Sequence, residues 1–139
     1  MIAQFDGFEI NSVHNGDAWK ICDFTITNND RLKRYFPKTL EQNQNPTLSQ
    51  LFVENKVRQF ERKEEFLFTV KQSETRNLVG LIYLKEIDWD KKQGEFAYCI
   101  DYNFKGKEII SKAVELLLDY ASKELGLKAF QIIAHKDNL

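Results

Sequence analysis

The segment from residue 95 to residue 135 constrains the fold of this chain most, because it predicts one helix between two strands with very short connections. The runs Glu95–Ile100 and Ala129–His135 are apolar and partly aromatic, as strands are. Between them, apolar residues recur at the spacing i, i+3, i+4, i+7 and i+11 of one helical face: Ile110, Ala113, Val114, Leu117 and Ala121. Gly126 provides a left-handed stop for this helix. Such a unit implies a right-handed parallel crossover between the two strands.

Three strand-like segments with short polar turns between them end where this helix begins: 66–71, 78–87 and 95–100. They predict an antiparallel meander, and Phe8–Val13 predicts one more strand near the start. The predicted order is β-α-α-β-β-β-α-β, an α+β fold with a mixed, mostly antiparallel sheet flanked by helices. The polar segment 41–46 is interpreted as a loop inside a single domain of residues 1–139, because neither side of it could form a core alone.

Two helices are expected between the first two strands. The first begins at Gly16–Asp17, where Asp17 is a suitable N-cap. Pro37 is expected to stop any helix in the partly apolar segment 32–37. The second helix begins at Thr47, because Thr47 and Gln50 have the spacing of a capping box.

The composition excludes several classes of protein. The 139 residues are 42% hydrophobic and carry 20 basic and 21 acidic side chains, so the formal net charge of −1 gives no footprint for a nucleic acid. No apolar run approaches the roughly 20 residues that span a membrane, and the first residues do not resemble a signal peptide. Cys22 and Cys99 lie far apart and are interpreted as free thiols of a cytoplasmic protein, with a disulfide or a reactive thiol as the alternative. No metal site is predicted.

A glycine between two lysines stands at the start of the strongest predicted helix, in the sequence Lys105-Gly106-Lys107. A helix N-terminus leaves four backbone N–H groups without partners and carries partial positive charge, so it suits a phosphate. Gly106 would let that ligand approach the backbone closely. The alternative is that Gly106 only turns the chain and that the lysines are solvated. The sequence contains neither GxxxxGK[ST] nor GxGxxG, which excludes two better-known phosphate loops.

Five stretches follow one another along the chain in this order: RLKRYFP, LVGLIYL, GEFAYCID, NFKGKEIISKAVELLLDYASKELGL and AFQIIAHKDN. Together with the order of elements they resemble the GNAT acetyltransferase superfamily, in particular the bacterial branch that acetylates ribosomal-protein N-termini and related amines. The resemblance covers the chain from about Asp17 to the end. The combination of stretches is more specific than any one of them.

The resemblance implies an acetyl-CoA site at the start of the helix. The pyrophosphate loop of the family has the pattern Q/R-x-x-G-x-G/A, which reads Asn103-Phe104-Lys105-Gly106-Lys107-Glu108 here. Backbone N–H groups of Lys105 to Ile109 would hold the pyrophosphate. Asn103 and Glu108 depart from the pattern, and a carboxylate at position 108 could repel a pyrophosphate or point to solvent.

The resemblance also assigns cofactor contacts along the neighbouring strands. Backbone groups of Cys99 and Ile100 would bond to the pantetheine arm where the last two strands splay apart, and Asn138 would help to hold acetyl-CoA after the final strand. The alternatives are ordinary sheet residues and a turn residue. Cys99 is not expected to carry the acetyl group, since the family transfers it directly to an amine.

Glu95 matches a proposed catalytic base in related enzymes, which would remove a proton from the acceptor amine. The alternative is a glutamate that only faces solvent. Tyr98 and His135 are weaker candidates for the same role, because such residues in a sheet are more often packed or satisfied.

The function implied by the resemblance is transfer of an acetyl group from acetyl-CoA to a primary amine, either a protein N-terminus or a small amine. The alternative is a non-catalytic acyl-CoA-binding or interaction domain, which Glu108 favours. The last helix and two strands of the family have no counterpart before Leu139. We therefore expect a fragment or truncated product whose intact parent is the enzyme, with an uncovered sheet edge through which two copies could form a homodimer.

Overall fold

A six-stranded sheet forms the centre of the computed structural model, which describes residues 1–104 and 108–133. The strands lie in chain order across the sheet: β1 Ala3–Phe5, β2 Phe8–Ser12, β3 Phe66–Gln72, β4 Leu78–Asp88, β5 Gln93–Ile100 and β6 Ala129–Ile133. The first five strands pair antiparallel, and β6 pairs parallel with β5. The predicted meander, crossover and α+β class are therefore confirmed, whereas β1 was not predicted.

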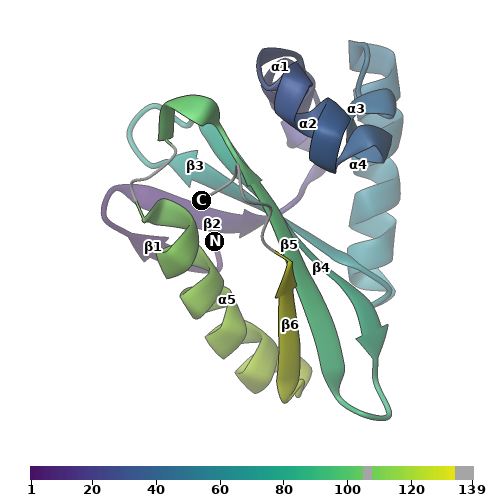
Figure 1. Cartoon of the computed structure of the whole chain (residues 1–139), viewed down its shortest axis with the longest axis vertical. Helices are drawn as coiled ribbons and strands as arrows, with labels where there is room; N and C mark the ends of the chain where they lie inside the picture. Colours follow the sequence, from purple (N-terminus) through teal and green to yellow (C-terminus); the bar gives the residue numbers. More distant parts are fainter. Residues whose placement is uncertain (105–107, 134–139) are drawn as a thin grey trace.

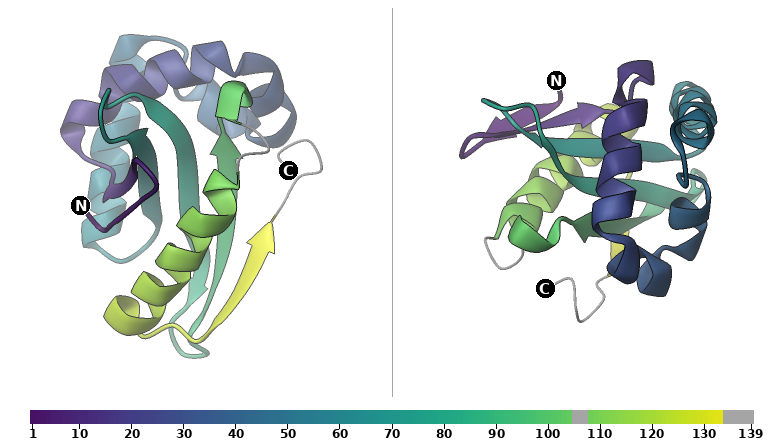
Figure 2. Two further views of the ribbon diagram at one scale, coloured as in Figure 1. Left: turned by 90° about the vertical axis from the view of Figure 1, so that its left-hand side faces the viewer. Right: turned by 90° about the horizontal axis from the view of Figure 1, so that it is seen from above.

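The helices are divided between the two faces of the sheet (Figures 1 and 2). One face is covered by the N-terminal helices and the other by α5. The helical elements are η1 Asn15–Asp17, α1 Ala18–Thr27, α2 Asn29–Tyr35, α3 Pro37–Glu41, α4 Pro46–Glu61, η2 Tyr102–Phe104 and α5 Ile109–Leu125. Within the described ranges, no helix is both long and apolar enough to cross a membrane.

Each central strand is buried on both faces, because successive side chains point to opposite sides of a strand. In β4, Ile82 and Leu84 pack in the core beneath α5, whereas Leu81 and Tyr83 pack beneath α1–α4. The apolar face of α5 that the sequence predicts joins the first of these cores. A sheet covered on both sides leaves its strand ends as the accessible places for a ligand, and the site lies at one of them.

The starts of α1 and α4 are capped differently from the sequence-based prediction. Asp17 occupies the N-cap position of α1 but makes no side-chain cap bond there. Its carboxylate accepts instead from the backbone N–H of His14, at 3.0 Å, and from Lys71, at 2.6 Å. The α4 helix begins at Pro46, and Asn45 caps it by accepting from the N–H of Leu48 at 2.9 Å, so the predicted Thr47–Gln50 capping box is wrong.

Pro37 also behaves differently from the prediction. It does not exclude helix from this region, because α2 runs up to Tyr35 and α3 begins at Pro37 itself. Proline suits the first position of a helix, where its missing N–H would have no partner anyway. The last helix begins at Ile109 rather than at Lys107, and residues 105–107 lie outside the described part of the chain.

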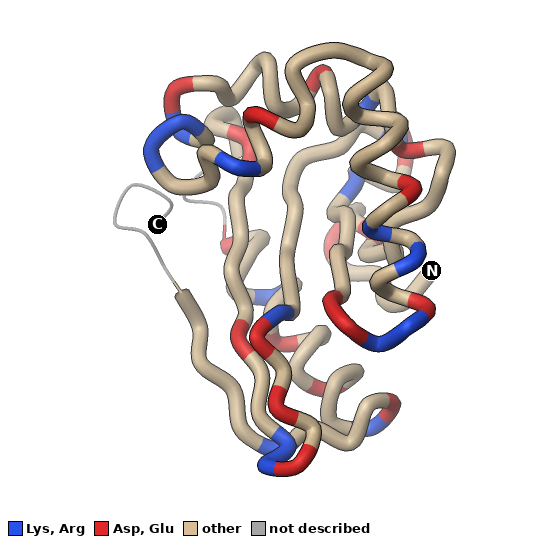
Figure 3. The backbone as a smooth tube through the Cα atoms, turned by 90° about the vertical axis from the view of Figure 1, so that its right-hand side faces the viewer, with Lys and Arg blue, Asp and Glu red and all other residues tan. Residues whose placement is uncertain are grey.

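The structure shows the state of the two cysteines and the distribution of the charged residues. Cys22 and Cys99 are both buried and free, which confirms the interpretation as thiols. Basic and acidic positions are mixed over the molecule (Figure 3). In residues 1–104 and 108–133, no three potential metal ligands from His, Cys, Asp and Glu come together.

Candidate functional site

The C-terminal end of β5 extends past its pairing with β6. The last described parallel pair is Ala97↔Ile133, and β5 continues for three further residues to Ile100. The N–H of Asp101 donates to the carbonyl oxygen of Val79 in β4, at 2.7 Å. Because neighbouring residues of an antiparallel strand alternate in direction, the backbone groups of Ile100 point away from β4, toward the side of β6. Of the two predicted pantetheine contacts, the backbone of Ile100 thus faces the side of β6 and that of Cys99 faces β4.

The Cys99 side chain lies in the core beneath α1–α4. Burial raises the pKa of its thiol to about 11; the nearby Arg31 opposes this effect and Asp101 adds to it. A buried thiol that holds its proton this strongly is a poor nucleophile at neutral pH. The structure therefore gives Cys99 the character of a packed core residue.

A short turn leads from β5 into the predicted cofactor loop. The Asp101 carboxylate accepts a hydrogen bond from the N–H of Asn103, at 2.9 Å, and the Asp101 carbonyl accepts from the N–H of Phe104, at 2.9 Å. These bonds form η2 and leave the Asn103 side chain exposed. Of the predicted loop residues, Lys105, Gly106 and Lys107 lie outside the described chain, as does Asn138.

Two residues of the α1–α2 junction hold this turn in place. The Asn28 amide donates to the Asp101 carboxylate at 3.1 Å and its oxygen accepts from the N–H of Tyr102 at 3.1 Å. The Arg31 guanidinium donates to the carbonyl oxygen of Ile100. Neither residue was predicted to contact the turn after β5, because nothing local marks a partner about 70 positions away in the chain.

At the start of α5, Glu108 adopts the left-handed backbone conformation, with φ 61° and ψ 13°. Its side chain is exposed and makes no cap bond to the helix. Ile109, by contrast, is buried in the core. One turn later Lys112 pairs with Asp6 in the β1–β2 turn, and this hydrogen bond raises the pKa of Lys112. The first turn of α5 is thus held by the burial of Ile109 in the core and by the ion pair of Lys112 with Asp6.

Glu95 lies nearer the opposite end of β5. It is half-buried, pairs in register with Lys85 of β4 and Gln131 of β6, and lines a hollow of about 290 Å³ between these strands. Five residues separate it from Ile100, roughly 16 Å along a strand. By the alternation of β5 it shares a face with Cys99. Its role as a base stays a prediction.

A larger hollow of about 500 Å³ opens at the α1–α2 junction. Its lining combines exposed apolar surface with polar groups and includes both residues that hold the turn: Ile26, Thr27, Asn28, Asn29, Asp30, Arg31 and Tyr102. Tyr102, in the turn that follows β5, is therefore part of the lining of this hollow.

The mixed sheet, with one parallel pair between β5 and β6 and a short turn that leads from β5 toward a helix start, has the topology expected of an acetyltransferase type of α+β domain. Comparison with known families agrees with this class. Residues 9–139 match the family described as acetyltransferase (GNAT) domain, and the chain belongs to that family.

Similar proteins include ribosomal-protein acetyltransferases. The chain is 28% identical over 124 residues to the "Putative ribosomal N-acetyltransferase YdaF" of Bacillus subtilis (strain 168), covering 88% of this chain and 66% of that relative. The structure of a ribosomal-protein-S5-alanine acetyltransferase from Vibrio fischeri superposes with a TM-score of 0.85 at 20% identity, over 94% of this chain and 72% of the other. A RimL ribosomal L7/L12 α-N-protein acetyltransferase in complex with coenzyme A gives a TM-score of 0.83 at 14% identity, over 94% and 72%.

Proposed function

We propose that this domain transfers the acetyl group of acetyl-CoA to a primary amine. The observation that supports the proposal is the C-terminal end of β5, where the backbone groups of Ile100 point to the side of β6 beyond the last pair in the described residues; its carbonyl oxygen accepts from Arg31, and η2 follows before α5. An extended amide chain such as pantetheine can bond to a free strand edge as another strand would. The diphosphate that follows it in coenzyme A suits the N-terminus of a long helix.

The residues present fit such a ligand. Asn103 and Glu108 flank the loop, and the first backbone N–H groups of α5 have no partner within the helix. In the proposal these groups, with Lys105 to Ile109, hold the pyrophosphate, Ile100 bonds to the pantetheine arm, and Asn138 adds a contact. Glu108 carries the one negative side chain among residues 103–108. Its repulsion of the pyrophosphate is therefore expected to limit the affinity for coenzyme A.

The chemical step needs one base and one leaving group. The neutral acceptor nitrogen attacks the thioester carbonyl carbon, the new C–N bond forms and the C–S bond breaks. The CoA thiolate leaves and takes up the proton that the nitrogen loses as it becomes an amide. The proton of the acceptor ammonium must be removed before attack. We assign this task to Glu95, directly or through a water molecule, because Cys99 and the tyrosines whose pKa burial raises, Tyr83 and Tyr98, hold their protons too firmly.

The acceptor that we propose first is the N-terminus of a ribosomal protein. The support is that two relatives bear such an activity in their names, on ribosomal proteins S5 and L7/L12, and that YdaF carries a ribosomal assignment too. The hollow at the α1–α2 junction, with Asp30 beside exposed Ile26 and Tyr102, has the mixed lining that a short peptide with a charged amine would need. A small amine is the second candidate.

The experiment has a binding arm and a turnover arm. Saturating coenzyme A should raise the melting temperature, since a ligand at 100 times its Kd stabilises the folded state by about 2.7 kcal/mol. Thiol release from acetyl-CoA is then measured with peptides that copy ribosomal-protein N-termini, and with the same peptides blocked at the N-terminus as the control. Release with the blocked peptides at an equal rate would refute N-terminal acetylation.

A non-catalytic acyl-CoA-binding domain is the rival function, and Glu108 favours it. This rival predicts stabilisation by coenzyme A without thiol release for any amine, including spermidine and free amino acids. The absence of stabilisation at millimolar coenzyme A would contradict both functions.

A further inference from the structure

Asn28 joins the α1–α2 junction to the turn that opens the cofactor loop. We propose that Asn28 is a positioning residue for coenzyme A: it holds Asp101 and Tyr102 so that the chain enters the loop in its binding geometry before the ligand arrives. This inference rests on the proposed function, because it assumes that the loop after Phe104 holds the cofactor.

All the hydrogen-bonding groups of the Asn28 side chain are used. Its amide nitrogen donates to the carbonyl oxygen of Phe24 at 3.0 Å and to the Asp101 carboxylate at 3.1 Å, and its oxygen accepts from the N–H of Tyr102 at 3.1 Å. The residue is only 4% exposed. A buried amide satisfied on both ends permits one orientation, and removal of one partner costs the desolvation of the other.

Both backbone hydrogen-bonding groups of Asn28 also have partners. Its N–H donates to Phe24 at 3.0 Å as α1 ends, and its carbonyl accepts from the N–H of Leu32 at 3.0 Å as α2 begins. Asn28 therefore belongs to a rigid joint between two packed helices, and whatever its side chain holds is fixed relative to the sheet.

The groups that Asn28 holds are the last ones before the loop. Asp101 passes the restraint on, since its other carboxylate oxygen accepts from Asn103. Arg31, one turn along from Asn28, fixes the carbonyl of Ile100 on the open edge of β5. The α1–α2 junction thus holds both proposed contacts of the ligand: the strand edge for the pantetheine arm and the entry to the pyrophosphate loop.

The test begins with Asn28→Asp, which keeps the shape and the acceptor oxygen but places a carboxylate against that of Asp101. We expect a loss of about tenfold in coenzyme A affinity by isothermal titration, with the fold retained in circular dichroism. Combining it with Asp101→Asn restores an amide–carboxylate pair in the reverse direction, and the affinity should return to within about threefold of the unmodified protein.

Asn43 provides the matched control. It is also buried, and its side chain donates to the carbonyl of Thr39 at 2.8 Å and accepts from the Ser49 hydroxyl at 2.7 Å, so both side-chain bonds serve the α3–α4 connection; only its backbone carbonyl reaches α1, where it accepts from Cys22 and Thr25. Asn43→Asp should lower the melting temperature without changing the Kd for coenzyme A. If it weakened binding as much as Asn28→Asp, the effect would be general destabilisation and the positioning role would be wrong.

The remaining outcomes separate this inference from the proposed function. If the unmodified protein does not bind coenzyme A, the proposed function fails. If it binds and Asn28→Asp binds equally well, or the double variant does not recover, only the positioning role fails. Should Asn28→Asp not fold, Asp101→Ala removes the same link from the other side; a tenfold loss of affinity supports the role and an unchanged Kd overturns it.

Discussion

Glu108 holds a backbone conformation that glycine adopts at no steric cost. Its φ of 61° places the Cβ close to the following carbonyl, which costs roughly 1 kcal/mol or more in an ordinary residue. At this position of the family's loop pattern, glycine avoids both the backbone strain and the negative charge, whereas alanine avoids only the charge. We predict that Glu108→Gly raises the free energy of unfolding by about 1 kcal/mol and tightens the binding of coenzyme A.

Two further variants separate conformation from charge. Glu108→Gln keeps the strain and removes the charge, so it should tighten binding without added stability. Glu115→Gly, at an exposed position inside the same helix, should instead cost about 1 kcal/mol. Equal coenzyme A affinities for residue 108 as Glu, Gln and Gly would contradict the repulsion, and urea unfolding measures the stability of each variant.

Cys99 gives a prediction about alkaline pH. The thiol pKa rises from 9.0 when unfolded to about 11 when folded, so between these values the folded state binds the extra proton. The stabilising effect is intact below pH 9 and is lost as pH rises toward 11, a loss on the order of 2 kcal/mol. Cys99→Ala should flatten this part of the curve of unfolding free energy against pH. Burial also raises the pKa of Tyr83, so a residual slope above pH 10 is expected to persist.

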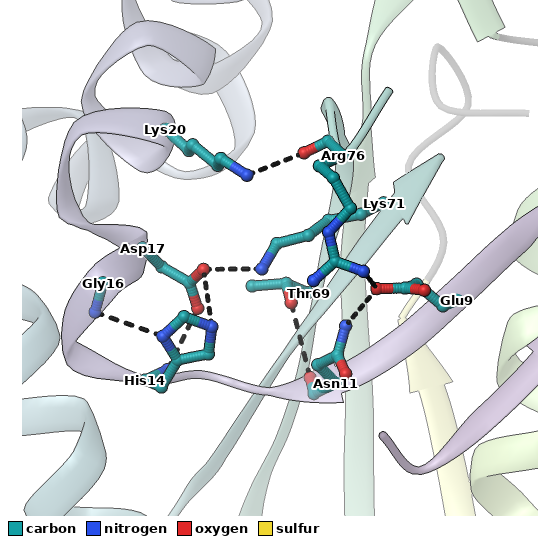
Figure 4. Close-up of polar contacts among 9 residues, drawn as sticks. All are labelled: Glu9, Asn11, His14, Gly16, Asp17, Lys20, Thr69, Lys71 and Arg76. Atoms are coloured by element: carbon teal, nitrogen blue, oxygen red, sulfur yellow. Dashed lines mark hydrogen bonds and ion pairs between the residues drawn. The ribbon is translucent and has the colours of Figure 1, made fainter. Parts of the chain in front are cut away.

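At the scale of elements, a buried ion pair fastens α1 to the sheet (Figure 4). Lys71 of β3 donates to Asp17 at 2.6 Å, and both side chains are only 1% exposed. Beside them Arg76 pairs with Glu9, and the Lys20 ammonium donates to the carbonyl of Arg76 at 2.9 Å. Burial and then the charge of Lys71 lower the pKa of Lys20. The cluster joins β2, β3 and α1 through charge rather than apolar contact.

We predict that Asp17→Asn lowers the free energy of unfolding by about 3–5 kcal/mol, because it leaves the Lys71 ammonium buried opposite a neutral group. The matched control is Asp119→Asn, in the exposed pair with Lys123 on α5, which should change stability by less than about 1 kcal/mol. Chemical denaturation compares the two. Similar losses of unfolding free energy for both variants would show that the buried pair stabilises the fold no more than the exposed pair does.

The strands were predictable from sequence because their signals are local. Runs such as 66–71 and 78–87 are apolar, β-rich and bounded by polar turns, and β3 and β4 match them within a residue. The helix starts were less predictable, because Asn45 competes with Thr47 as a cap and Asp17 has a distant partner in Lys71. A short strand such as β1, of three residues, has too little sequence to show a period.

The candidate site, like the fold, was predictable from sequence only where its signals are local. The family pattern identifies the loop at 103–108 and the strand before it, since those residues are consecutive. The contacts of Asn28 and Arg31 with residues 100–102 were not predicted, because only the folded chain brings these residues near one another. Glu95 could be named from its position in β5, whereas its distance from the loop becomes visible only in the structure.

At the scale of the whole molecule, the sheet is protected unevenly. The β3, β4 and β5 strands have neighbours on both sides and helices on both faces, whereas β6 is the last strand of the sheet in the described part of the chain. Its outer N–H and C=O groups can therefore pair with another strand. Ile132 of β6 is 47% exposed, so an apolar side chain lies on the surface of this strand, which has no outer neighbour within the described residues.

We predict that two copies of this chain associate through β6. Ile132→Lys should weaken the association, because a charge on an edge strand must be desolvated when another strand pairs with it, while the monomer loses little. Trp19→Lys removes a still more exposed apolar residue, 65% exposed on α1, and should leave the association unchanged. Sedimentation velocity over a hundredfold range of concentration measures both variants. If only Trp19→Lys weakened the association, the contact would lie on the α1 face instead of β6. If the unmodified protein were monomeric at every concentration, the prediction would be wrong.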